Sequence, residues 1–264
     1  MIATSTLVVL HAHPDDEAIF TGATIRRAVD QGARVVLVSA TGGEAGECRL
    51  ELAGGETLHR RRLAELERAC DLLGVARLVL LGHRDSGAHR GPYAPGTLGA
   101  AALGDVVARV EQVVRAENAD ALVHYDPRGI TGHVDHRQVH RAGRQVAARL
   151  GLTAYEATLD RAALRRGAYP LARAATDEPD RMGVAPRSVS LTLTATEREL
   201  TIKREAMAVH RSQIAPEALD ASTFTSGYGR EWFLRRGAPG VLDALATGSG
   251  HEAAASRDLS LAGH

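Results

Sequence analysis

Two histidines and three carboxylates lie close together near the start of the chain, within residues 11–17 (His-Ala-His-Pro-Asp-Asp-Glu). His13 and Asp16 are three residues apart, so if Pro14 opens a helix their side chains project from one short turn and can bind one cation. Acidic residues in the first turn of a helix also complement the positive end of its dipole. That alternative explains the carboxylates but leaves the histidines without a role.

A second group of this kind occupies residues 126–136 (Asp-Pro-Arg-Gly-Ile-Thr-Gly-His-Val-Asp-His). Each group directly follows an apolar run typical of a buried strand, at 6–10 and at 121–125. Because the carboxyl ends of parallel strands share one edge of a sheet, we expect the two groups to lie side by side. Two imidazoles and one carboxylate, with a position left for water, form the ligand set of a catalytic zinc rather than of a structural one.

The rest of the pattern predicts the scaffold that would position these groups. Apolar runs at 6–10, 34–39, 77–81 and 121–125 alternate with predicted helices at 17–30, 57–73 and 100–117. Such alternation is typical of an α/β fold with a doubly wound, mostly parallel, Rossmann-like sheet.

We assign this core to residues 1–150 and a smaller α+β extension to residues 151–243. The extension is predicted to contain an edge strand at 188–194 and a helix at 195–210. Residues 1–243 are therefore expected to form a single domain. Residues 244–264 are small, polar and interrupted by glycine, and we expect a flexible tail there.

The composition is that of a neutral globular protein. The 264 residues include 32 Lys and Arg against 32 Asp and Glu, with 44% hydrophobic residues, so we expect no nucleic-acid partner. No apolar run approaches the ~18 residues that span a bilayer, and the start of the chain lacks a basic segment ahead of an apolar one. These features favour a cytoplasmic protein with no membrane insertion, whether monomer or homo-oligomer. Cys48 and Cys70 are expected to be unpaired thiols.

Residues 12–17 (Ala-His-Pro-Asp-Asp-Glu) and 132–136 (Gly-His-Val-Asp-His) resemble the motifs of the PIG-L/LmbE family of zinc-dependent N-acetylglucosaminyl deacetylases. Residues 62–66 and 210–213 agree with the same family. The resemblance implies a metal site, with zinc or alternatively iron bound by His13, Asp16 and His136. It also implies that Asp15 is the general base and that His133, supported by Asp135, is an electrostatic stabiliser or acid.

The chemistry of these residue types agrees with those roles. Zinc lowers the pKa of bound water towards ~7 and polarises an amide carbonyl. Asp15 adjoins a ligand and can accept the proton of the water. His133 can donate a proton if Asp135 holds its tautomer and favours its charged form.

Two positions depart from the family pattern, and one histidine competes as a ligand. Val134 stands where relatives usually have proline, and Thr131 stands where some have a tyrosine thought to help polarise the carbonyl. His140 follows His136 by four residues, a spacing that places two imidazoles on one helix face as in other zinc sites.

Two further residues are candidates for binding substrate. Arg62 either binds a substrate hydroxyl or phosphate, as the resemblance suggests, or is a solvated helix residue of the run Arg60-Arg61-Arg62. Asp85 either binds a sugar by hydrogen bonds or belongs to a turn.

Together these observations predict a metal-dependent hydrolase that removes an N-acetyl or related acyl group from a small molecule containing an amino sugar. A mycothiol-conjugate-type amidase is the alternative within the same fold. A nucleotide-binding protein and a non-catalytic sugar-binding module are the alternatives from other classes. The glycine-rich residues 41–46 lack both the G-x-G-x-x-G pattern and a P-loop lysine, which disfavours the nucleotide alternative.

Overall fold

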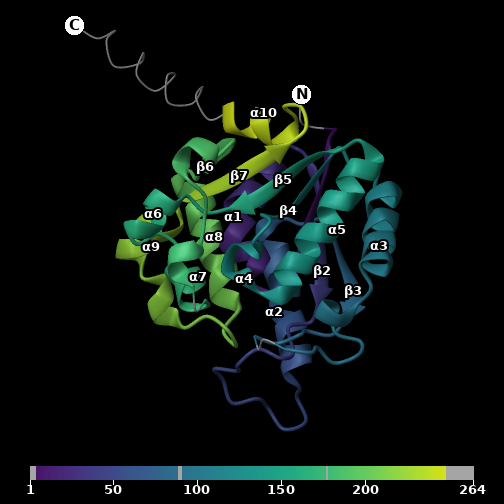
Figure 1. The fold of residues 1–264 in the computed structure, drawn as a ribbon. Coiled ribbons are helices and arrows are strands. Elements are labelled where there is room, and N and C mark those ends of the chain that lie inside the picture. The colour runs from purple at the N-terminus through teal and green to yellow at the C-terminus, as the bar shows by residue number, and fades with distance from the viewer. Residues whose placement is uncertain (1–3, 89–90, 177, 248–264) are drawn as a thin grey trace, which may run out of the picture.

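The fold is built on one mostly parallel β-sheet, in which the strands run in the order β3-β2-β1-β4-β5-β7-β6 (Figure 1). The computed structural model describes residues 4–88, 91–176 and 178–247. Within them the strands are β1 (Thr6–His11), β2 (Arg34–Thr41), β3 (Arg77–His83), β4 (Ala121–Tyr125), β5 (Thr153–Thr158), β6 (Leu191–Thr194) and β7 (Arg230–Arg236). Strands β1 to β5 pair in parallel, whereas β7 is antiparallel to both β5 and β6. This arrangement confirms the predicted fold class.

Helices cover both faces of the sheet. They are α1 (Asp16–Asp30), α2 (Leu58–Leu73), α3 (Leu103–Ala116), α4 (Gly129–Gly132), α5 (Val134–Leu150), α6 (Arg161–Arg165), α7 (Pro170–Ala174), α8 (Glu197–Val209), α9 (Ala221–Tyr228) and α10 (Val241–Thr247). Helices α1, α2 and α8 pack together on one face, and α3 packs with α5 on the other. Every residue of β1 and β4 is buried, because helices cover the sheet on both sides there.

The order of the strands reverses beside β1. From β1 the chain passes outward through β2 to β3, then returns to β4 on the other side of β1. The loops after β1 and β4 therefore meet at the point where the helices change face, which is where ligands bind in open α/β sheets. The predicted juxtaposition of residues 11–17 with residues 126–136 depends on this reversal.

The part of the chain after residue 150 extends the same sheet. Strand β5 follows at once as a fifth parallel strand, and β7 lies between β5 and the edge strand β6. The predicted strand 188–194 and helix 195–210 correspond to β6 and α8, whereas β5 and β7 were not expected. None of the helices in the described ranges has both the length and the apolarity needed to cross a membrane.

The end of the described chain differs from the prediction. Residues 244–247, expected to begin a flexible tail, belong to helix α10. The reason is that Leu242 and Leu245 are completely buried in the core, which fixes this helix against the sheet. The rest of the predicted tail, residues 248–264, lies outside the described residues.

Candidate active site

The loop after β1 places His13 and Asp16 at the carboxyl edge of the parallel strands. Helix α1 begins at Asp16, whose carboxylate Oδ2 accepts the backbone N–H of His13 at 3.0 Å. Asp15 precedes the helix with φ of 111°, a left-handed conformation that non-glycine residues rarely adopt. The Asp15 side chain makes no capping hydrogen bond to the helix, so its carboxylate is available to the cavity.

Three predicted ligand atoms converge on one point. The distance between His13 Nδ1 and Asp16 Oδ2 is 3.4 Å, that between His136 Nε2 and Asp16 Oδ2 is 3.3 Å, and that between the two nitrogens is 3.2 Å. A tetrahedral ion with bonds of 2.0–2.1 Å needs ligand atoms separated by about 3.3 Å. All three side chains are buried. The spacing of the atoms therefore suits a small divalent metal.

The partners of the two imidazoles leave lone pairs facing that point. His136 Nδ1 lies 3.0 Å from the Gly129 carbonyl oxygen, and His13 Nε2 lies 3.2 Å from Asp135 Oδ2. With the proton of each neutral ring on the nitrogen that faces these acceptors, His13 Nδ1 and His136 Nε2 are left unprotonated and can bind a metal. Such contacts are the ones that orient metal-binding histidines.

The charges around the point also favour a cation. Burial opposes a charge on His13, yet contacts with Asp135, Asp16 and Asp85 raise its pKa well above the ordinary value. Burial likewise opposes ionisation of Asp16, but His136 and His13 hold the pKa of this carboxyl well below its usual range. Three carboxylates around one imidazole form an excess of negative charge that a divalent metal would neutralise.

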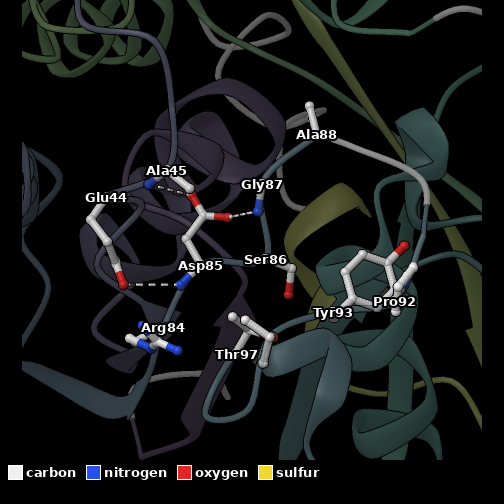
Figure 2. A pocket seen from close by; sticks show the side chains of 11 residues that line it. Glu44, Ala45, Arg84, Asp85, Ser86, Gly87, Ala88, Pro92, Tyr93 and Thr97 are labelled. Atoms are coloured by element: carbon white, nitrogen blue, oxygen red, sulfur yellow. Dashed lines mark hydrogen bonds between the residues drawn. The ribbon is translucent and has the colours of Figure 1, made fainter.

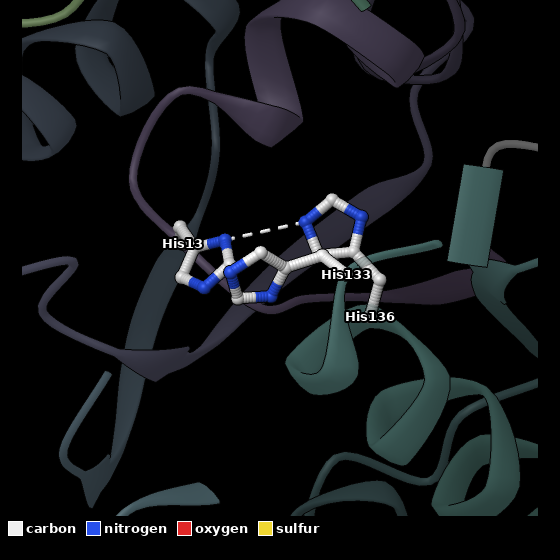
Figure 3. A group of neighbouring side chains, drawn as sticks. All are labelled: His13, His133 and His136. Carbon is white, nitrogen blue, oxygen red and sulfur yellow. Dashed lines mark hydrogen bonds between the residues drawn. The ribbon is translucent and has the colours of Figure 1, made fainter. Parts of the chain in front are cut away.

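His133 lies beside the imidazoles of His13 and His136, as Figure 3 shows. Its Nδ1 accepts the backbone N–H of Asp135 at 3.2 Å, so the proton of the neutral ring is on Nε2. Burial, together with the charges of His13 and His136, lowers the pKa of His133 to about 3. The ring is therefore a neutral donor in this structure.

The Asp135 carboxylate lies near His133, which we expected it to support, but its hydrogen bonds go to other residues. That carboxylate instead accepts hydrogen bonds from the backbone N–H and the hydroxyl of Ser86, and it faces His13 Nε2. The reason is that Asp135 is completely buried in the first turn of α5 and points across the sheet edge towards the end of β3. Its side chain thus orients a predicted metal ligand, and Asp135 holds His133 through its backbone N–H.

Arg62 is buried and is not a solvated helix residue. Its guanidinium donates to the carbonyl oxygens of Gly43 and Pro14, at 2.6 Å each, and to Asp15 Oδ2 at 3.2 Å. These contacts tie the loop after β2 to the loop after β1. Burial is the largest influence on Asp15 and raises the pKa of its carboxyl to about 6, although Arg62 acts in the opposite direction.

Asp85 lies on the other side of the cluster, at the end of β3. One carboxylate oxygen accepts the Gly87 N–H at 2.8 Å and lies 3.5 Å from His13 Nε2, while the other accepts the Ala45 N–H at 3.3 Å (Figure 2). His13 outweighs the effect of burial and lowers the pKa of Asp85. Asp85 is thus both a turn residue and a neighbour of the predicted metal-binding point.

His140 is not part of the cluster. Its Nδ1 lies 3.0 Å from the carbonyl oxygen of Tyr125 and 3.8 Å from Glu156 Oε1, behind β4. The hydroxyl of Tyr125, by contrast, donates to Asp16 Oδ2 at 2.6 Å. This tyrosine could not be expected at the site from its sequence context, because it lies within an apolar strand.

Two other residues support the site from behind. Glu17 Oε2 accepts the backbone N–H of Asp15 at 2.9 Å, and Glu17 Oε1 lies 2.6 Å from His210 Nε2. Both residues belong to segments that resemble the family, residues 12–17 and 210–213. This resemblance was the one feature of the sequence that could have pointed to them. The contact between His210 and Glu17 depends on where α8 packs. The sequence pattern predicted this helix but not its position in the fold.

The cluster opens into a cavity of about 640 Å³. The predicted site residues that line it are His13, Asp15, Asp16, Arg62, Asp85, His133 and His136, and Thr131 lines it as well. A second cavity of about 650 Å³ adjoins the first and shares Asp85 and Gly87 with it (Figure 2). The arrangement can hold a metal at the base of a cavity, with a carboxylate and an imidazole donor beside it.

Solved structures with this fold include proteins described as deacetylases. N,N'-diacetylchitobiose deacetylase from Pyrococcus horikoshii is 20% identical, covers 88% of this chain and 84% of its own, and has a TM-score of 0.61. The zinc-inhibited form of teicoplanin deacetylase Orf2 is 17% identical, covers 88% of this chain and 99% of its own, and also has a TM-score of 0.61. Because the sequence identities are 20% and 17%, the likeness to these structures establishes the fold and no more.

The relatives found by sequence have higher identities to this chain than the two solved structures. The family model described as GlcNAc-PI de-N-acetylase (PIG-L) matches residues 8–147. A protein of Nocardiopsis dassonvillei named 1D-myo-inositol 2-acetamido-2-deoxy-alpha-D-glucopyranoside deacetylase is 38% identical over 57% of this chain, and the match spans 58% of the relative's length. A protein of the same name from Geodermatophilus obscurus is 33% identical over 92% of this chain and 96% of its own. By the extent of these matches, the chain belongs to the PIG-L family of GlcNAc-PI de-N-acetylases.

Proposed function

We propose that this protein is a metal-dependent hydrolase that removes the N-acetyl group from an amino sugar carried on a small molecule, releasing the free amine and acetate. The observation that carries the proposal is the convergence of His13 Nδ1, Asp16 Oδ2 and His136 Nε2 within 3.4 Å of one another, with Asp15 lining the same cavity. The deacetylase names of the sequence relatives support the choice of the acetyl group and of the amino sugar.

In this proposal each side chain has one task. His13, Asp16 and His136 hold the metal, zinc or iron, and Asp135 orients His13. When bound, the metal would polarise the acetyl carbonyl and lower the pKa of water towards about 7.

Asp15 accepts the proton of the attacking water and returns it to the amine nitrogen as the C–N bond breaks. His133 Nε2–H donates to the carbonyl oxygen as negative charge develops on it.

Arg62 and Asp85 both line the cavity, so both are placed to contact a substrate bound there. The seven-stranded sheet shared by both parts of the chain supports residues 1–243 acting as one deacetylase domain.

The test is reconstitution of metal-free protein with Zn²⁺ or Fe²⁺, followed by incubation with a panel of N-acetylated amino-sugar conjugates. Mass spectrometry of the sugar and an assay for acetate should show loss of the acetyl group only in metal-loaded samples. Both metals are needed because a structural neighbour is described in a zinc-inhibited form. Cleavage of larger acyl amides without acetate release from any acetylated sugar would favour the amidase alternative.

A further inference from the structure

A third hollow, of about 430 Å³, borders the metal-site cavity beside α4 and α5. We call it the arginine basin because Arg128, Arg137 and Arg181 all line it. The remaining lining residues are Tyr93, Pro127, Thr131, Gly132, Val134, Thr176 and Glu178.

The described residues that line the basin carry more positive than negative charge. Glu178 is its one acidic lining residue among them, and it lies 3.0 Å from Arg181 and 3.8 Å from Arg128. Arg137 is exposed and has no ion pair within the described ranges. Among the described lining residues, three guanidinium groups thus face one carboxylate.

The basin is continuous with the candidate active site. Thr131 and Thr176 line both the basin and the metal-site cavity, and Thr131 is two residues from His133. A small side chain at Thr131, where some members of the family have tyrosine, leaves the two hollows side by side. A ligand with its acetamido group beside His133 can therefore extend over Thr131 towards the arginines.

The other neighbouring cavity has the opposite character. Glu44 and Asp85 line it, with Arg84 as its one described basic residue. An anionic group would be repelled from that cavity and attracted to the basin. The charges therefore favour one orientation of a bound anionic substrate, with its anionic group towards the basin.

We infer that the arginine basin binds an oxyanion, a carboxylate or a phosphate, on the part of the substrate beyond the amino sugar. This inference rests on the proposed function and narrows its substrate class to anionic amino-sugar conjugates. Planar guanidinium groups bind both oxyanions through paired hydrogen bonds, so the two share one recognition chemistry.

The test compares α-glycosides of N-acetylglucosamine that differ only in one group on the aglycone: 4-carboxyphenyl, 4-phosphophenyl and the neutral 4-carbamoylphenyl. Calorimetry with metal-loaded Asp15→Asn protein measures their binding without requiring turnover, and acetate release by the unmodified protein measures kcat/KM. The same measurements are made with Arg137→Ala, with Arg137→Glu and with a control, Arg149→Ala. Arg149 is exposed on the same helix about 18 Å away and pairs with Glu111.

We expect at least one anionic glycoside to bind about tenfold more tightly than the carbamoyl glycoside, as one charge-assisted contact would give. Arg137→Ala should reduce that preference to near one, Arg137→Glu should reverse it, and Arg149→Ala should leave it intact. Whichever anion is preferred identifies the oxyanion. Equal binding of all three glycosides, or a preference that survives Arg137→Glu, overturns the inference. Absence of acetate release from every glycoside would count against the proposed function, and the calorimetry would still decide on the basin.

Discussion

His210 Nε2 lies 2.6 Å from Glu17 Oε1, although 193 residues separate them in the sequence. The other oxygen of Glu17 accepts the backbone N–H of Asp15, which is in the left-handed region at φ 111°. Such a conformation costs of the order of 1–3 kcal/mol and persists only where the surroundings enforce it. The buried pair therefore holds the backbone of the proposed general base, while Arg62 holds its side chain.

The Glu17–His210 pair should make stability depend on pH. Burial opposes the charge on His210, but Glu17 chiefly, with Asp15 and Glu65, raises its pKa above 6.5. The imidazolium thus stabilises the folded state fully below about pH 6.5, and this contribution is lost as the pH rises through the raised pKa. Urea unfolding of metal-free protein from pH 6 to 9 should show the difference between the unmodified protein and His210→Gln shrinking with pH. A difference that stays constant would mean that His210 does not titrate in this range.

Replacing His136 by Ala should abolish metal binding and activity together while leaving the fold intact. The side chain supplies one of three converging ligand atoms, and its removal leaves too few for tight binding. Metal content by elemental analysis, activity and circular dichroism report the three properties. His140→Ala is the matched control and should keep its metal, because His140 lies behind β4. The reverse result would assign the ligand to His140.

Asp15→Asn should retain metal but lose about 10²–10⁴-fold in kcat. An amide has the shape of the carboxylate and cannot accept the proton of the water. The measurement is steady-state acetate release at equal metal occupancy. Turnover close to that of the unmodified protein would place the proton transfer on another group.

Asp135→Asn should weaken metal binding about 10–100-fold, as losses of such orienting contacts usually do. The two carboxylate oxygens accept from both donors of Ser86 and face His13, and an amide cannot satisfy all three. Competition with a chelator measures the affinity. His133→Ala is the comparison, since it should lower kcat with metal retained. Equal metal affinity in Asp135→Asn and the unmodified protein would separate Asp135 from the metal centre.

Lys203→Met should destabilise the fold by about 3–5 kcal/mol, because it leaves the carboxylate of Glu231 buried without its counter-charge. The ammonium lies 2.7 Å from Glu231 Oε1, and both side chains are completely inaccessible to solvent. The double variant Lys203→Met/Glu231→Gln should recover part of the loss in urea unfolding. A double variant no more stable than the single one would show that the charge of Glu231 was not the cause.

The sequence was sufficient to predict the location of the site. Buried parallel strands have continuous apolar runs, so β1 and β4 could be recognised, and the polar groups that follow them had to meet at one edge. The ligand spacing around His13 follows from this local pattern. The partner of Asp135 could not be predicted in the same way, since it depends on how the end of β3 approaches α5. Strand β7 was missed because its charged ends obscure the apolar centre, Trp232 to Leu234.

The antiparallel strands at the end of the sheet also constrain the order in which the sheet can form during synthesis of the chain. Strand β6 pairs with β7 and with no other described strand, although the ribosome makes it about 36 residues earlier. Until β7 is made, the Leu191–Thr194 segment has no strand to pair with, although the five parallel strands already exist in the chain. Closure of the sheet waits for Arg230–Arg236, so a ribosome stalled in this interval would carry a polypeptide with β5 as an open hydrogen-bonding edge.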